Sequence, residues 1–321
     1  MNGFLDGIKD ILRPIVHEYR RNRFRLAWRE AKAKRASLHV GARQIAADLR
    51  RLGISSGDVV FLHSSLKSIG YVEGGARTVL QALLDVITPE GTLIVPTYYL
   101  PDRSIHYVHQ DKEYVFDPRA HSTYLGEIPS TFLRLPGIER SIHPTHSISA
   151  LGRNAKYVTE LHHRAPSTFG SGSPWQRCIE LGGKVMGLGV SMGPVTFYHV
   201  LEDALEDQFP LAVKLRETYY LKCRDWANNL IEVPFRPFDP QIVRRRIDQP
   251  RREDLCRYFW IEFERAGLLS VGRIGEALSW FIEARRFYDH LYVLMKQNIT
   301  IYSTEEQLRQ RPPGSADKVV G

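Results

Sequence analysis

Alternating helix-like and strand-like segments predict an α/β fold, in which a sheet carries helices on its faces. Apolar residues recur at three- and four-residue steps over 45–52 and 79–87, which indicates two helices. Continuous apolar runs at 58–63, 92–99 and 184–190 have the length of buried strands. The order helix, strand, helix, strand favours a layered α/β domain over an all-helical or all-strand protein.

The other segments follow in chain order. Gly53 ends the first helix, and the turn 88–91 separates the second helix from the strand after it. A loop rich in proline and histidine extends to about residue 136. We then expect a helix over 199–207, a hairpin over 213–236 turning at 226–229, a helix over 255–266 and an aromatic-rich helical segment over 277–296.

Residues 1–40 are predicted to form a basic amphipathic helical extension. They hold ten Lys and Arg against four Asp and Glu, so most of the net charge of +8 lies there. The rest of the chain is close to neutral, which argues against a nucleic-acid partner. The apolar face of the extension either packs on the body or lies on an anionic membrane surface. Residues 1–36 are therefore a candidate for peripheral membrane contact.

The composition, 43% hydrophobic and 25% charged, is typical of a soluble globular protein. No apolar run approaches the roughly 20 residues that span a bilayer. The three cysteines are widely spaced, which argues against a disulfide framework and favours a reducing compartment. We therefore expect a cytoplasmic protein, with one α/β domain over 41–302 and a disordered tail over 303–321. These patterns do not indicate an oligomeric state.

Four polar clusters follow predicted strands or open loops, where α/β proteins place ligands. Residues 63–66, HSSL, offer hydroxyls and backbone N–H groups to a phosphate or pyrophosphate. Residues 140–147 carry two histidines, and the glycines of 169–174, FGSGSP, permit close approach of a ligand to the backbone. The last cluster is 196–202, TFYHVLE. Each cluster alone also fits an ordinary turn or connector.

The clearest chemistry lies in the last cluster. His199 and Glu202 are three residues apart, so on a helix they share one face. A carboxylate beside a histidine fixes the tautomer of the ring and raises its basicity. The same spacing is common in surface pairs, so both interpretations stay open from the spacing alone.

Histidines also suggest a metal-site alternative. His143 and His146 are separated by two residues and, together with His199, would suit a metal-dependent hydrolase. They lack a cysteine or carboxylate cluster at a usual zinc spacing, so we expect no metal.

In this order the clusters resemble the aminoglycoside 3-N-acetyltransferase family, also described as antibiotic N-acetyltransferases. The likeness starts with GDVVFLHSSLKSIGYVEGGA and continues through PEGTLIVPT, FDPRAHSTYLGEI and LPGIERSIHPTHSISALG. It ends in FGSGSPWQRCIELGGKVMGLGV and TFYHVLE. The resemblance covers about residues 41–300 and leaves the extension outside.

The resemblance implies a three-layer α/β/α sandwich with a central mixed sheet, and acetyl-CoA as the acetyl donor. It places Ser64, Ser65 and Leu66 at the pyrophosphate and pantetheine of CoA. It also places Ser147 on the CoA side of the site.

The same resemblance assigns the catalytic residues. His199 matches the active-site histidine, Glu202 the carboxylate that follows it, and His143 the histidine of the loop beside the site. The expected reaction is direct transfer of an acetyl group to an amine of an aminoglycoside or aminocyclitol, with His199 taking the proton.

The chain departs from the family just before TFYHVLE. The family usually has an acidic or amide residue there, facing the acceptor, where this chain has Gly193, Pro194 and Val195. His121 also stands where the family commonly has Thr or Ser-Pro. The altered loop and the basic extension favour a second acceptor class, a nucleotide-linked amino sugar of surface polysaccharide synthesis.

Overall fold

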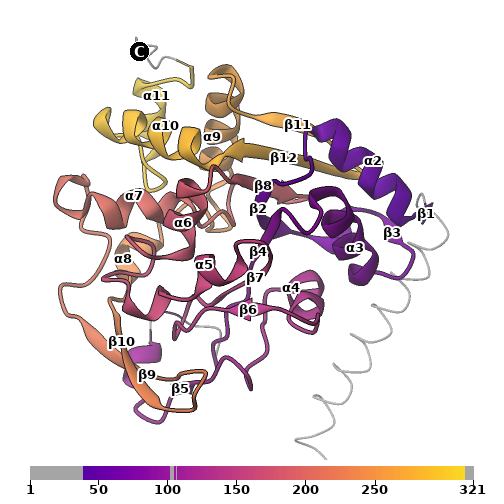
Figure 1. Cartoon of the computed structure of the whole chain (residues 1–321). Coiled ribbons are helices and arrows are strands. Elements are labelled where there is room, and N and C mark those ends of the chain that lie inside the picture. The colour runs from indigo at the N-terminus through magenta and orange to yellow at the C-terminus, as the bar shows by residue number, and fades with distance from the viewer. Residues whose placement is uncertain (1–38, 102–104, 106, 315–321) are drawn as a thin grey trace, which may run out of the picture.

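The computed structural model describes residues 39–101, 105 and 107–314, so nearly all of the expected extension over 1–40 lies outside it. Figure 1 shows three layers, with a central sheet between two groups of helices. The sheet contains both parallel and antiparallel pairs. The predicted α/β/α sandwich with a mixed central sheet is therefore confirmed.

The central sheet has seven strands in the order β11-β12-β8-β2-β4-β7-β6. Its middle strand, β2 (Val59–Ser64), runs parallel to β8 (Lys184–Leu188) and to β4 (Thr92–Pro96). The outer strands are all antiparallel to their neighbours: β7 (Ile148–Gly152), β6 (Glu139–Arg140), β12 (Ala277–Glu283) and β11 (Ser270–Ile274). Three parallel carboxyl ends thus lie side by side at one edge.

Two apolar cores lie on opposite faces of this sheet. One core is formed with α2 (Ala42–Leu52), α3 (Ala76–Ile87) and α4 (Glu127–Phe132). Side chains of β2 alternate between the two faces, so Leu62 joins this core and Phe61 joins the other. The helices of the other face are α5 (Ala155–Thr159), α6 (Pro174–Glu180), α7 (Tyr198–Ala204), α9 (Glu253–Arg265) and α10 (Ala284–Lys296).

A small three-stranded sheet forms a separate core beside the sandwich (Figure 1). It consists of β5 (Val115–Phe116), β9 (Tyr219–Arg224) and β10 (Leu230–Phe235), and β9 and β10 form the hairpin expected from the sequence. The short strands β1 (His39–Val40) and β3 (Tyr71–Val72) pair elsewhere, and α8 (Pro240–Val243) follows the hairpin.

Three expectations need correction. The segment 277–296 is not helical throughout, because its first seven residues form β12, which pairs with β8 and β11. The loop expected up to residue 136 contains β5 and α4. Disorder after residue 302 does not hold for α11 (Glu305–Gln310), which Thr304 begins with a capping box to Gln307. Among the described helices, none combines the length and apolar character needed to span a bilayer.

Gly187 of β8 admits the largest side chain of the neighbouring strand. Trp280 of β12 is fully buried against it and donates through Nε1 to the carbonyl oxygen of Val190 at 2.9 Å. A Cβ atom at Gly187 would meet the indole ring closer than van der Waals contact allows. The glycine therefore lets one tryptophan hold the loop that leaves β8.

We predict that Gly187→Ala destabilises the protein by about 1–3 kcal/mol, because the indole must move within a close-packed core. Urea unfolding followed by circular dichroism measures this loss. Gly272→Ala is the matched control, since the tightest contact of its Cβ would be with the flexible end of the Leu52 side chain, at 3.2 Å. Equal stability losses in the two variants would contradict the role given to Gly187.

Candidate active site

The polar clusters meet at the carboxyl edge of the three parallel strands. Ser64 ends β2 opposite Leu188 of β8, and the backbone N–H of Ser65 donates to the carbonyl of Leu188 at 2.9 Å. On the other side, the N–H of Thr97 donates to the carbonyl of Ser147 at 3.0 Å. The sheet thus brings together, at this edge, the HSSL segment, the HPTHS segment (residues 143–147) and the segment that follows β8.

His199 and Glu202 form a buried pair at the start of α7. Nδ1 of His199 lies 2.8 Å from Oε2 of Glu202, and the two residues are 7% and 2% exposed. A carboxylate oxygen accepts, so the ring donates its Nδ1–H and the neutral tautomer leaves Nε2 with a lone pair. Within the described part of the chain, Nε2 has no hydrogen-bond partner. This is the geometry of a histidine prepared to accept a proton.

Two aromatic rings hold the His199 ring from different elements. The centroid of Phe169 lies 5.0 Å away and that of Phe238 lies 4.9 Å away. Phe169 belongs to the FGSGSP loop, and Phe238 follows the β9–β10 hairpin. These contacts limit rotation of the imidazole, and the FGSGSP cluster therefore contributes a wall to the site.

A buried ion pair fixes that wall. Asp203 lies one residue after Glu202, accepts the backbone N–H of Phe169 at 2.8 Å and pairs with the Lys214 ammonium. Lys214 also lies over the rings of Phe169 and Phe238. The side chain of Asp203 is fully buried and already paired, so it does not offer a free carboxylate to a ligand.

A second cation near the site is also paired. Arg246 donates two hydrogen bonds to Asp248, at 2.8 and 2.7 Å, and its guanidinium lies over Phe238. Burial alone would raise the pKa of Asp248, but these hydrogen bonds outweigh it and lower that pKa. Burial and the negative charge of Glu202 raise the pKa of Tyr302, so this neighbour stays a neutral phenol.

His143 has a structural role in its own loop. Its Nδ1 accepts the backbone N–H groups of Thr145 and His146, at 3.2 and 3.0 Å, so Nε2 carries the proton. The residue is 1% exposed and its ring stacks on His162 at 4.4 Å. A proton on Nε2 and an occupied Nδ1 leave no lone pair for a metal. The catalytic part expected of His143 stays a prediction.

The metal-hydrolase alternative finds no support in this arrangement. His146 has its Nδ1 2.8 Å from the hydroxyl of Thr145, while the Nδ1 of His199 faces Glu202. Among the described residues, no group of three or more His, Cys, Asp or Glu side chains is placed to hold a metal ion.

Ser147 lies deeper than the resemblance suggested. It is 1% exposed, donates to the carbonyl of Thr97 at 2.8 Å and accepts from Arg140 at 3.2 Å. Contact with CoA would require this hydroxyl to exchange a partner, so that role stays a prediction.

The HSSL segment has buried polar atoms without hydrogen-bond partners at the end of β2. Among described residues, the hydroxyl of Ser64 and Nε2 of His63 are buried without partners. Ser65 accepts a hydrogen bond from Ser68, whose hydroxyl is also 2.9 Å from the Gly189 carbonyl, and Leu66 packs against the core behind it. Unpaired buried groups are costly, so a ligand that reaches Ser64 would relieve the cost. This fits the predicted CoA segment without testing it.

Sequence reasoning missed the residues that surround His199 from distant segments. Phe238, Lys214 and Arg246 carried no motif, and only their place near the predicted hairpin gave a signal. The segment 193–195, which departs from the family, is largely buried. Gly193 and Val195 are buried, and of the three residues only Pro194 is exposed.

A buried histidine–carboxylate pair thus lies at the carboxyl edge of a mixed α/β sheet, an arrangement that suits proton transfer. Residues 61–296 match the family model described as aminoglycoside 3-N-acetyltransferase. This match covers more than half of the chain, and the chain belongs to that family.

Individual relatives agree with this assignment. Aminoglycoside N(3)-acetyltransferase VII of Streptomyces paromomycinus is 34% identical over 88% of this chain and 98% of its own length. Aminoglycoside N(3)-acetyltransferase III of a Salmonella species is 38% identical over 49% of this chain, and the chain spans only 58% of that relative.

Solved structures share the fold. The crystal structure of aminoglycoside acetyltransferase AAC(3)-Xa has a TM-score of 0.69 and 30% identity, over 84% of this chain and 98% of its own. AAC-IIIb in its binary complex with CoASH has a TM-score of 0.69 and 24% identity, over 83% of this chain and 100% of its own.

Buried neutral histidines around the site make stability depend on pH. Burial lowers the pKa of His63 to about 4 and that of His162 to about 3. Burial also lowers the pKa values of His143 and His146 well below the ordinary value. As pH falls below about 6.5, the unfolded chain takes up protons that these folded rings do not.

We therefore predict that the free energy of unfolding is largest above pH 6.5 and falls as pH approaches 4. His63 alone accounts for about 2 kcal/mol of this loss at pH 5. Urea unfolding at pH 7, 6 and 5 measures the slope, which His63→Gln should reduce and His39→Gln, at an exposed position, should not. A stability that is constant over this range would refute the interpretation.

Proposed function

We propose that this chain is an acetyl-CoA-dependent N-acetyltransferase that acetylates an amine of an aminoglycoside or aminocyclitol, with His199 as the general base. The observation that carries the proposal is the 2.8 Å hydrogen bond between His199 Nδ1 and Glu202 Oε2, in a buried site where Nε2 keeps its lone pair. Family membership supports the reaction class, and relatives named as aminoglycoside N(3)-acetyltransferases support the acceptor.

The reaction needs one proton transfer in step with acyl transfer. The acceptor nitrogen attacks the thioester carbonyl, a C–N bond forms and the C–S bond breaks. His199 Nε2 takes the proton from the amine, and that proton can then reach the leaving CoA thiolate. Glu202 stabilises the imidazolium that exists between these two events. Such acid–base catalysis is typically worth about 10²–10⁴-fold in rate.

Acetyl-CoA is the donor in this proposal. Its binding is assigned to Ser64, the last residue of the middle strand, and to Ser65 and Leu66, which follow it. The unpaired hydroxyl of Ser64 supports this assignment. The solved relative AAC-IIIb is described in complex with CoASH, which agrees with a CoA site in this fold.

The charges around His199 favour a cationic acceptor over a nucleotide-linked amino sugar. An anionic nucleotide needs free Arg or Lys side chains. The buried Lys214 pairs with Asp203, and the partly buried Arg246 pairs with Asp248, so both cations at the aromatic wall are neutralised. The charge of Glu202 then remains as the net charge of the residues around His199, and this negative charge attracts an amine.

The expected location of the protein stays a proposal as well. A cytoplasmic enzyme with acetyl-CoA as co-substrate is consistent with the chemistry above. Membrane contact through residues 1–36 concerns a segment outside the described residues, and nothing in the fold bears on it.

We predict that His199→Ala lowers kcat by about 100-fold or more, while KM for acetyl-CoA changes little. Release of the CoA thiol in the presence of sisomicin measures turnover. His39→Ala changes an exposed histidine that is distant from His199 in the sequence. It serves as the control and should retain wild-type rates.

Two outcomes would overturn the proposal. Near-wild-type turnover of His199→Ala would remove the base assignment. Acetylation of a UDP-linked amino sugar in preference to sisomicin would reverse the acceptor class while keeping the CoA chemistry.

A further inference from the structure

A second polar hollow lies away from His199. It measures about 350 Å³ and is bounded by β6, α5, the 3-10 turn His162–Arg164 and the turn of the β9–β10 hairpin. Neither His199 nor any residue of its aromatic wall and ion pairs lines this space. Its volume is within the range of small-molecule sites.

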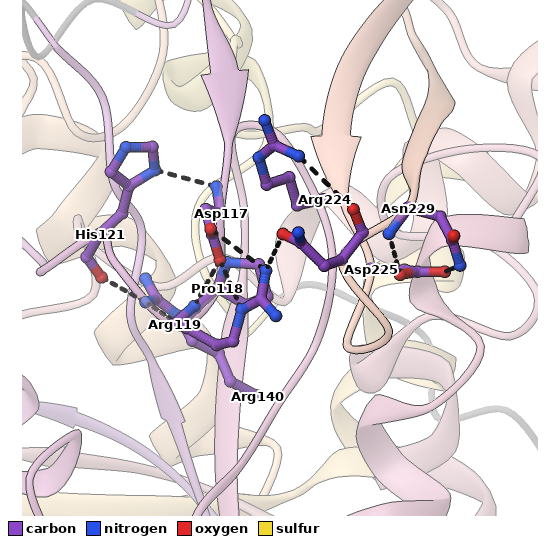
Figure 2. A network of polar contacts seen from close by, with 9 residues as sticks. Asp117, Pro118, Arg119, His121, Arg140, Arg224, Asp225 and Asn229 are labelled. Carbon is purple, nitrogen blue, oxygen red and sulfur yellow. Dashed lines mark hydrogen bonds and ion pairs between the residues drawn. The ribbon is translucent and has the colours of Figure 1, made fainter.

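Arg140 forms the floor of the hollow and is an unusual buried cation. It is 3% exposed, and its terminal nitrogens donate to the backbone carbonyls of Pro118 and His121 (Figure 2). They also donate to the carbonyl of Thr97. Among the described residues, its Nε–H has no acceptor. Burial lowers the pKa of Arg140 only to about 10, so the group is charged near neutral pH. A buried charged donor without a partner is a costly feature that a ligand can relieve.

His163 is a second lining residue with an unpaired polar atom. In the described part of the chain its Nδ1 is buried without a partner. Burial lowers the pKa of His163, which favours a neutral ring able to accept a hydrogen bond at Nδ1. The unpaired donor and the unpaired acceptor therefore belong to two residues that line the same space.

The wall opposite Arg140 is held in place before any ligand arrives. Asp225 accepts the backbone and side-chain N–H groups of Asn229, at 2.7 and 2.9 Å, which closes the hairpin turn (Figure 2). Arg119 donates to Asn228 in this turn at 2.9 Å and also to Asp117. The Arg119 segment belongs to the loop whose carbonyls Arg140 binds. Both walls are thus parts of one hydrogen-bonded unit, and such preorganisation favours binding.

The lining indicates what chemistry fits. Trp226 is 49% exposed at the rim, and the lining places three carboxylates, Glu139, Glu160 and Asp225, against two cations, Arg140 and Lys156. Glu160 is already paired with Arg177. The excess of carboxylates disfavours an anionic ligand, and an apolar ligand would leave Arg140 Nε unpaired. A hydroxyl group can accept from Arg140 and donate to His163. An ammonium group suits the carboxylates, and the C–H face of a sugar ring suits an indole.

We propose that this hollow is a second binding site that takes a small polyhydroxylated amine, an amino sugar, separate from the acceptor site at His199. The site binds its ligand without chemistry. Glu139 has no ion-pair partner among the described residues, so it is the carboxylate free to hold the ammonium group.

The test uses the full chain labelled with 5-fluorotryptophan and titrated with glucosamine in the absence of acetyl-CoA. The chain has five tryptophans, and Trp226→Phe identifies the ¹⁹F resonance of Trp226. We expect that resonance to shift saturably. Glu139→Gln should weaken the apparent Kd about tenfold or more, as for the loss of one charge-assisted hydrogen bond. Glu232→Gln, on β10 outside the hollow, should leave the Kd unchanged.

Glucose and citrate distinguish the ligand classes. Glucose should bind more weakly than glucosamine, and citrate should not shift the resonance. Resonances of the buried Trp175 and Trp280 report whether each variant is folded. An unmoved Trp226 resonance, an equal Kd in Glu139→Gln or a stronger response to citrate would each overturn the proposal. Because no acetyl transfer is measured, this outcome is independent of the function proposed for His199.

Discussion

The parallel pairing of β2 with β8 on one side and β4 on the other is the constraint on which the site depends. It places three carboxyl ends at one edge, so the HSSL turn, the segment after β8 and the start of β7 meet there. Gly187 keeps β8 and Trp280 in close contact, and Trp280 in turn binds the loop that leads to His199. The position of the histidine is therefore set by strand register and core packing, well before α7 begins.

Burial gives the site its chemical character. The charges next to His199 have fixed neighbours: Oε2 of Glu202 accepts from the neutral ring, Asp203 pairs with Lys214, and Asp248 pairs with Arg246. Buried charges without partners would be costly, whereas these pairs fix the orientation of the groups they join. The pairs also hold Phe169 and Phe238 against the imidazole. Groups that are already oriented need little rearrangement when a substrate arrives. Such preorganisation is usually the largest electrostatic contribution to the rate of an enzyme.

Local patterns in the sequence were enough for the first strands and helices and for the His199–Glu202 pair, because their signals lie within a few residues. β12 was mistaken for helix, since an apolar run such as ALSWFIE fits either state and only pairing with β8 decides it. Phe238, Lys214 and Arg246 reach the site through tertiary folding and have no local signature. The carbonyl shell around Arg140 is likewise invisible in sequence, because backbone groups carry no residue code.

The central claim is that Glu202 holds His199 in the tautomer that leaves Nε2 free to accept a proton. Nitrogen-15 NMR of histidine-labelled protein at neutral pH observes this directly, with His199→Gln used to assign the resonances. We expect a protonated Nδ1 and an unprotonated Nε2 for His199, and loss of this preference in Glu202→Ala, which removes the acceptor. A His199 that carries its proton on Nε2 in the wild-type protein would contradict it.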